Sequence, residues 1–258
     1  MISIYEKIRN HARFLASRYP VAAFYQDYPE QVAFSLRMFD TDAVVSNLRD
    51  FVAGHMEDDF GHGLHHAVKV ALDAGALAAV EGRGFNSGKD AVVSEGHMHH
   101  RVRMAQCAGL LHDIRRKRKN HAQEGAVFAE KLLGEYGFSH DDVADICLAI
   151  ENHEAFGQTK PGRTLEGGLL SACLYDADKF RWGVENFTHT VWAMVSYADI
   201  PIRKFMDIYP SGILFLEKIK TTFRTPTGRI YGPQFIDQGL SLGENLYGYI
   251  QTEFAGYL

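Results

Sequence analysis

Apolar residues recur at intervals of three and four along most of the chain, which is the spacing of one face of an α-helix. Alternation of the kind that marks a half-buried strand is missing, so the pattern predicts an all-α fold. Helices are expected from Ile4 to about Pro20, over 28–55 as one or two elements with Pro29 near the start, and over 64–80, 102–112, 121–136, 141–151 opened by Ser139, 169–197 and 243–254.

Turn-forming residues interrupt this pattern at two places. The first predicts an exposed loop and contains Gly82, Gly84, Asn86 and Gly88. The second, over residues 198–235, predicts short helices and loops, because it contains Pro201, Pro210, Pro226 and Pro233. We expect one domain over 1–258, with helical extensions at 1–50 and 201–258 around a core at 51–200 that carries an insertion at about 81–101.

Composition narrows the class of protein. A hydrophobic content of 46% is that of a globular domain. A net charge of −5 and a pI near 6.2 argue against a general nucleic-acid or membrane-surface binder. No apolar run reaches the roughly 20 residues of a membrane span, and no signal peptide is evident. The three cysteines, which have no CxxC spacing, are expected to be core residues in a reducing compartment. We therefore expect a cytoplasmic protein, whose oligomeric state the sequence does not reveal.

The dipeptide His112-Asp113 ends an apolar helical stretch and directly precedes a run of basic residues. Buried imidazole and carboxylate groups without partners cost on the order of several kcal/mol. A cation bound by both side chains would remove this cost. We therefore interpret the pair as candidate metal ligands.

Other histidines and aspartates on or at the ends of predicted helices could supply the remaining ligands. Along the chain they are His62, His65, His66, His121, His153, Asp176 and Asp178. Such ligands suit Mn, Fe, Co, Ni or Zn, with Mg also possible, and the number of ions, one or two, is left open. No cysteine lies among them, which argues against a purely structural zinc site.

In this order of ligands the chain resembles the HD-domain metal-dependent phosphohydrolases, over roughly residues 58–197. The segment "HHAVKV" is similar to the helix that carries the family's first ligand, here His66. The segment "LLHDI" is similar to the signature pair, here His112 and Asp113. The resemblance implies an HD-domain helical bundle with N- and C-terminal helical extensions.

The later segments resemble the HDIG subset and the dinucleoside polyphosphate hydrolases. In "HAQEGAVFAEKLL" a histidine, His121, opens a helix and Gly-Ala follows four and five positions later. "AIENHEAFG" resembles the segment of the next ligand, His153, and "DADKF" resembles the closing Ala-Asp motif. This last motif favours Asp178 over Asp176. The two aspartates lie about 200° apart around a helix, so both cannot face one ion.

The resemblance implies a metal site and a reaction. One ion would be held by His66, His112, Asp113 and Asp178. If Asp113 also bridges, His121 and His153 would hold a second ion roughly 3.5 to 4 Å away. Water activated between the ions would attack phosphorus, with Asp113 as the catalytic residue. The implied substrate is a phosphoester or phosphoanhydride of a small molecule, with nucleotides as the class.

The chain departs from the family pattern after the signature pair. The HDIG subset commonly has a lysine two residues after the pair, whereas here Arg115 and Arg116 precede Lys117. Such a basic run is often a solvated loop. Its position beside two ligands also suits a phosphate clamp, for which Arg115 and Arg116 are the nearest candidates. The 46 positions between His66 and His112 indicate the insertion.

Further histidines have alternative explanations. His62 and His65 stand beside His66 in a glycine-containing turn. We expect their side chains either to contact the ligand residues without binding the metal or to face solvent. The cluster "GHMHH" contains His97, His99 and His100, and it is interpreted as a loop or helix start in the insertion. An independent metal site there would need an unusual backbone.

Two other function classes stay open. Some HD-domain proteins hold two irons and oxidise small polyols or phosphonates, and others are non-catalytic sensors. The spacing of nine positions between His112 and His121 is more similar to that of the hydrolases than to that of the oxygenases. Non-catalytic members typically lose ligands, whereas this chain retains the set.

Overall fold

The computed structural model describes residues 3–56, 63–85 and 94–258, and these residues form helices and no strand. The all-α prediction is therefore confirmed. The helices are α1 (Ile4–Ala16), α2 (Ala23–Asp27), α3 (Pro29–Thr41), α4 (Ala43–His55), α5 (Leu64–Phe85), α6 (Glu95–Leu111), α7 (His121–Leu133), α8 (His140–Glu151), α9 (Leu165–Phe180), α10 (Val191–Tyr197), α11 (Ile202–Ile219) and α12 (Pro226–Glu253). A π-helical turn, Asn186–Thr190, precedes α10. No helix in the described ranges has both the length and the apolar character needed to cross a bilayer.

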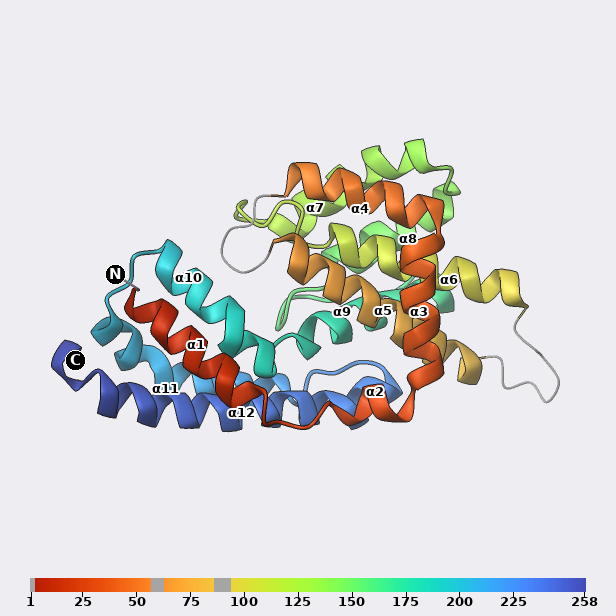
Figure 1. Ribbon diagram of the computed structural model, residues 1–258. Helices are drawn as coiled ribbons and strands as arrows, with labels where there is room; N and C mark the ends of the chain where they lie inside the picture. Colours follow the sequence, from red (N-terminus) through yellow and green to blue (C-terminus); the bar gives the residue numbers. More distant parts are fainter. Residues whose placement is uncertain (1–2, 57–62, 86–93) are drawn as a thin grey trace.

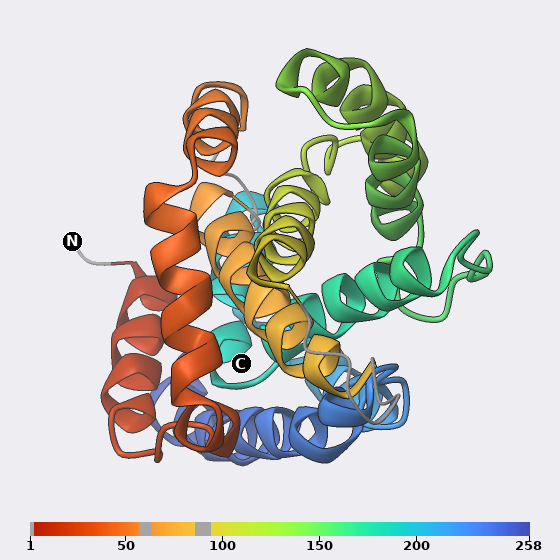
Figure 2. The ribbon, with the colours of Figure 1, turned by 90° about the vertical axis from the view of Figure 1, so that its right-hand side faces the viewer.

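Helices α5 and α6 lie at the centre, with α3 on one side and α8 and α9 on the other (Figure 2). Small residues let these two helices approach closely: a Cβ atom on Gly109 would lie only 2.5 Å from Ala71 Cα. A side chain at this position would force the helices apart. The close crossing brings the first turn of α5 next to the end of α6, where His66 and His112 lie.

The terminal parts of the chain pack along the central helices. Helix α12 runs along the lower edge of the molecule in Figure 1, where it contacts α1, α2 and α11 and also reaches α5 and α9. A single cluster of buried apolar side chains extends from Ile8 to Phe254. The terminal extensions and the central helices thus share one hydrophobic core.

Several helix boundaries agree with the sequence predictions. Pro29 is the first residue of α3, and α1 ends at Ala16, just before Pro20. Ser139 caps α8: its hydroxyl accepts from the backbone N–H of Asp142, whose carboxylate accepts in turn from the Ser139 N–H. This reciprocal capping satisfies donors that a helix start leaves unpaired.

The prediction of a single helix over 169–197 was wrong. The chain turns after α9 and continues through the π-helical turn into α10. The turn directly after α9 contains Gly183. A Cβ atom on this residue would lie 2.6 Å from the carbonyl oxygen of Phe235 in α12. The break therefore depends on close contact with a distant helix, which a local pattern does not reveal.

The prediction of short helices and loops over 198–235 was also wrong. Two long helices, α11 and α12, contain Pro210 and Pro233 in their interiors. Proline inside a helix costs about 3 kcal/mol, but both helices bury apolar faces along their length. In α11 the buried side chains include Phe205, Tyr209 and Leu216, and burial of such residues stabilises by roughly 1.5 to 3 kcal/mol each.

Most of the predicted insertion is helical rather than a loop. Helix α5 continues through Phe85, and α6 begins at Glu95, before the predicted start at 102. The rest of the predicted loop, 86–93, lies outside the described residues. The insertion thus lengthens the two central helices.

Candidate metal centre

Metal-type side chains from the ends of neighbouring helices meet in the interior of the molecule. His66 lies in the first turn of α5, and Asp178 lies in the last turn of α9. The others are His112 and Asp113 directly after α6, His121 at the start of α7 and His153 shortly after α8. All of these side chains are buried. The fold therefore brings the whole predicted ligand set together.

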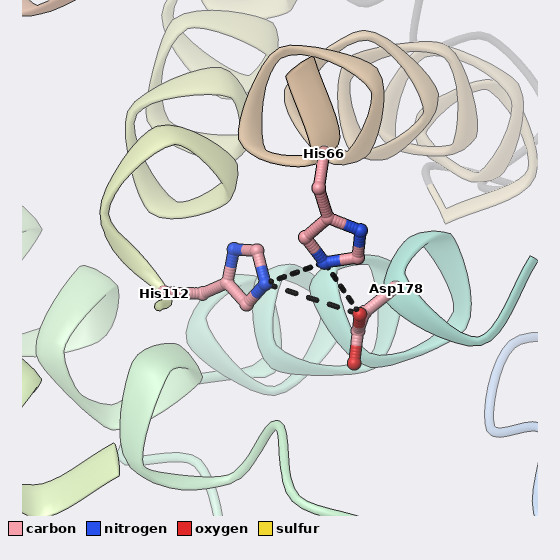
Figure 3. A group of neighbouring side chains, drawn as sticks. All are labelled: His66, His112 and Asp178. Atoms are coloured by element: carbon pink, nitrogen blue, oxygen red, sulfur yellow. Dashed lines mark hydrogen bonds and ion pairs between the residues drawn. The ribbon is translucent and has the colours of Figure 1, made fainter. Parts of the chain in front are cut away.

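The first cluster consists of His66, His112 and Asp178, which point toward one another from α5, α6 and α9 (Figure 3). His66 Nε2 lies 3.2 Å from His112 Nε2 and 3.2 Å from Asp178 Oδ1. His112 Nε2 lies 3.9 Å from the same oxygen. Ligands bound 2.0 to 2.2 Å from a metal stand roughly 2.8 to 3.6 Å apart. Two of the three distances fall in this range.

The second cluster consists of Asp113, His121 and His153. The Nε2 atoms of the two histidines lie 3.3 Å apart. Asp113 Oδ1 lies 3.4 Å from His121 Nε2 and 3.5 Å from His153 Nε2. All three distances match the spacing of ligands around one first-row divalent ion.

Asp113 connects the two clusters through its separate carboxylate oxygens. While Oδ1 faces the histidines of the second cluster, Oδ2 lies 3.5 Å from His112 Nε2 of the first cluster. A carboxylate with one oxygen toward each of two sites is the arrangement expected of a ligand shared by two ions.

Backbone carbonyls orient two of the ligand histidines. His112 Nδ1 lies 2.8 Å from the Gly109 carbonyl oxygen, and His153 Nδ1 lies 2.6 Å from that of Ile150. Because a carbonyl only accepts, Nδ1 is the donor in both rings, which leaves the Nε2 lone pair for a cation. In many metal sites, a hydrogen bond from the ring nitrogen that does not bind the metal fixes the orientation of the ligand histidine.

At His121 and Asp178, electrostatics favour the charge states that metal binding needs, whereas at His112 they favour the protonated ring. Burial lowers the pKa of His121 to about 4, with help from Arg116 and His153 and against the pull of Asp113, so this ring is neutral at pH 7. Burial raises the pKa of Asp178, but Lys179 and His66 outweigh burial and hold it well below the usual value. Burial lowers the pKa of His112, yet Asp113 and Asp178 raise it overall. The two carboxylates thus favour a positive charge at His112. A bound cation would supply that charge in place of the extra proton on the ring.

The two aspartates of α9 have different partners. Asp178 belongs to the first cluster, as the resemblance favoured. Asp176 instead accepts from the backbone N–H groups of Arg224 and Thr225 and from the Thr225 hydroxyl, at 2.7 to 2.8 Å. Asp176 therefore fixes the start of α12, while Asp178 faces the metal centre.

The other histidines that the structure describes in the predicted set lie away from the clusters. His65 has a side chain that is 60% exposed, with Nδ1 3.6 Å from Glu185 Oε1, while His62 lies outside the described residues. The histidines of "GHMHH" form the start of α6 and have separate partners. His97 faces Glu166, His99 packs edge-on against Phe34 and His100 contacts Asp142.

The predicted phosphate-binding residues have different surroundings. Arg116 Nη1 lies 2.9 Å from His121 Nε2 and 3.4 Å from Asp113 Oδ1, so its guanidinium lies against the second cluster. Arg115 lies over the ring of Phe128, 4.1 Å from its centroid, and Lys117 is exposed. Only Arg116 of the three contacts a ligand residue in the described structure.

Two cations near the centre, the buried Lys179 and the partly buried Arg224, were missed by the sequence analysis. Lys179 Nζ donates to Asp178 Oδ2 and to the His153 carbonyl oxygen, so it contacts a ligand of each cluster. Arg224 stacks on Tyr175 and donates to the carbonyl oxygen of Asn152, the residue before His153. A signal for Lys179 existed: it is a charged residue inside the apolar stretch that contains Asp178.

We expect two divalent ions per chain after loading with Mn, and one ion after His153→Ala. The substitution removes one of the three ligands of the second cluster and leaves the first cluster unchanged. Elemental analysis after desalting measures the stoichiometry. His65→Ala, at an exposed position, is the matched control and should keep two ions. A single ion in the unaltered protein that His153→Ala leaves in place would indicate a mononuclear site.

Comparison with known families agrees with this geometry. Residues 63–183 match the model of the family described as HD domain. This range contains every member of both clusters and ends just after α9. The comparisons with curated proteins and with solved structures gave no match.

Proposed function

Residues 63–183 form an HD domain, and on this basis we propose that the protein is a metal-dependent phosphohydrolase that acts on a phosphoester or phosphoanhydride. The observation that carries the proposal is the position of Asp113, which directs one carboxylate oxygen to each cluster. Bridged pairs of this kind are typical of enzymes that transfer phosphoryl groups to water.

Each cluster is assigned one divalent ion, with Asp113 as the shared ligand. Neutral imidazoles and carboxylates suit Mn, Fe, Co, Ni or Zn and accept Mg less readily. Bound ions would lower the pKa of a water molecule and neutralise charge on the phosphoryl oxygens. Asp113 holds both sites in register, while the carbonyls of Gly109 and Ile150 keep two histidine rings in the binding orientation.

Arg116 is the residue that we assign to the phosphoryl group of the substrate. Its guanidinium contacts His121 Nε2 and Asp113 Oδ1, the atoms that face a cation in the second cluster. With a cation at these atoms, the guanidinium is available to oxygens of a phosphate nearby, which it suits as a bidentate donor. Lys179 is assigned a structural part, since it neutralises Asp178 and holds the His153 carbonyl.

We expect Arg116→Ala to lower kcat/KM by about 10²- to 10³-fold, the scale for loss of one charge-stabilising donor. Metal content should stay at the unaltered value, because Arg116 supplies no ligand atom. Steady-state kinetics with parallel elemental analysis measures both effects. The control is Arg118→Ala, whose side chain is 67% exposed and should have little effect. A normal rate for Arg116→Ala would exclude this residue from phosphate binding.

The activity is tested with the full chain loaded separately with Mn, Co, Fe or Mg. The panel contains nucleotides, which are the class that the resemblance implies, a generic phosphodiester and simple phosphomonoesters. Release of phosphate or of the alcohol supports the proposal. If no compound is hydrolysed and the iron-loaded protein consumes oxygen with a polyol or phosphonate, the activity is that of a di-iron oxygenase. Inactivity in both assays would favour a sensor.

A further inference from the structure

A cavity of about 300 Å³ adjoins the metal centre. Its wall includes His66 of the first cluster and Arg116 beside the second cluster. The rest of the wall comes from the turn after α9, the π-helical turn, α10 and α11, none of which carries a member of the two clusters. The cavity is therefore continuous with the metal centre but is built largely by the C-terminal part of the chain.

The wall away from the metal centre is apolar. Its aromatic side chains are Trp182, Phe187, Phe205, Tyr209 and Phe215, and aliphatic residues of α10 and α11 complete it. The described lining residues include no carboxylate. Arg181, the second cation of the lining, already donates to Asp73, Glu185 and Tyr25. An anionic group thus fits beside Arg116, while the remainder favours hydrocarbon.

The backbone beside the cavity has two unusual features, a π-helical turn and a glycine inside a helix. The π-helical turn, Asn186–Thr190, contributes Asn186, Phe187 and Thr190 to the lining. Such turns are rare and are frequent at functional sites. Gly212 in α11 also lines the cavity and is exposed. Nothing lies within 4 Å of a Cβ atom built on it, so a side chain at this lining position would meet no steric obstacle.

Apolar side chains of the lining are also unusually exposed. Met194, Ile208 and Phe215 are 42%, 56% and 39% exposed. Exposed apolar residues that gather around a concave site are typical of ligand-binding surfaces. A ligand with an apolar body would cover them while its charged end lies at the metal centre.

We propose that this cavity binds the leaving group of a phosphate monoester, and that this group is apolar, such as an aryl-substituted or branched alkyl group. The proposal rests on the phosphohydrolase function. Water adds to phosphorus, the P–O bond to the apolar group breaks, and the leaving oxygen takes one proton. The products are inorganic phosphate and the alcohol. A nucleoside fits less well, because beyond His66 and the two arginines most of the described lining side chains are hydrocarbon, and buried polar groups without partners are costly.

The substrate preference is tested with 2-phenylethyl phosphate, glycerol 3-phosphate and AMP. Each releases a primary alcohol, so the intrinsic reactivities of the esters are similar. We expect kcat/KM to be at least tenfold higher for 2-phenylethyl phosphate than for either of the others. A preference for AMP or glycerol 3-phosphate would overturn the proposal.

Gly212→Phe tests whether the cavity is responsible. A phenyl ring at this lining position should occupy part of the cavity and lower kcat/KM for 2-phenylethyl phosphate at least tenfold. The control Gly248→Phe, at an exposed glycine of α12 outside the described lining, should keep it near the unaltered value. Unchanged thermal unfolding shows that the variant is folded. Ile208→Gln, at a 56% exposed position, gives a second test of the apolar wall without filling it. If Gly212→Phe and Ile208→Gln both hydrolyse 2-phenylethyl phosphate as well as the unaltered protein does, the proposal is contradicted.

A binding measurement separates this proposal from the proposed function. Calorimetry compares 3-phenylpropylphosphonate, an isostere that is not hydrolysed, with propylphosphonate, which lacks the ring. We expect at least tenfold tighter binding of the phenyl compound and loss of this difference in Gly212→Phe. If the difference is present and no ester is hydrolysed, the cavity binds apolar anions and the phosphohydrolase function fails. If esters are hydrolysed and the ring adds no affinity, the cavity proposal fails alone.

Discussion

Asp113→Asn is expected to remove metal from both clusters and to lower kcat/KM by more than ~10³-fold, beyond the loss from a single charge-stabilising donor. The amide retains the shape of the side chain but loses the negative charge. Asp113 is 3% exposed, and its two oxygens face His112 and His121 separately. No other carboxylate of the described clusters contacts both groups of histidines, so the change weakens both sites at once.

Elemental analysis and steady-state kinetics on the same preparation measure this effect. The matched control is Asp141→Asn, because the Asp141 side chain is 82% exposed and pairs with Arg163 at the surface. This control should retain two ions and full activity. Retention of two ions by Asp113→Asn would show that the carboxylate is not the shared ligand.

Arg181→Met is expected to lower the free energy of unfolding by about 3 to 5 kcal/mol, the cost of leaving a buried charge without its partner. Arg181 is 8% exposed and donates to Asp73, to Glu185 Oε2 at 2.7 Å and to the Tyr25 hydroxyl at 2.8 Å. Without the guanidinium, the Asp73 carboxylate is left in a buried position. For a chain of this size the expected fall in Tm is about 6 to 20 °C.

Thermal and urea unfolding measure the change. Arg118→Met is the control, because Arg118 forms an exposed pair with Glu124 at 3.7 Å and should change stability by less than about 0.5 kcal/mol. Adding Asp73→Asn to Arg181→Met removes the unpaired charge and should recover part of the loss. An Arg181→Met protein as stable as the unaltered one would mean that the buried pair contributes nothing net.

The grouping of these side chains could be predicted from the sequence, partly because some of them break a local rule and partly because their order resembles that of the HD-domain family. His112, His153 and Asp178 are polar residues in or beside apolar helical stretches, where folding alone does not favour them. The start of α8 was equally accessible, since the Ser139 cap and its partner lie within one turn. Features that depend on neighbours in sequence were thus readable in advance.

The features that could not be predicted depend on distant contacts. The break after α9 requires Gly183 to meet α12, and the continuity of α11 through Pro210 requires burial of side chains such as Phe205. Nor could the sequence show which of Arg115 and Arg116 lies beside the ligand residues. Their directions follow from the turn after α6, which places one over Phe128 and the other beside His121.

The first cluster draws its members from widely separated parts of the chain. His66 and Asp178 are 112 positions apart (178 minus 66), yet their ligand atoms lie 3.2 Å apart in the folded protein. Closing a loop of that length costs entropy that rises with the logarithm of its length, and an ion held by both residues offsets this cost in the manner of a removable cross-link. An ion that binds only the native chain stabilises it by about 2.7 kcal/mol at a hundred times its Kd. Persistence of the folded domain in the cell then becomes coupled to the supply of free metal.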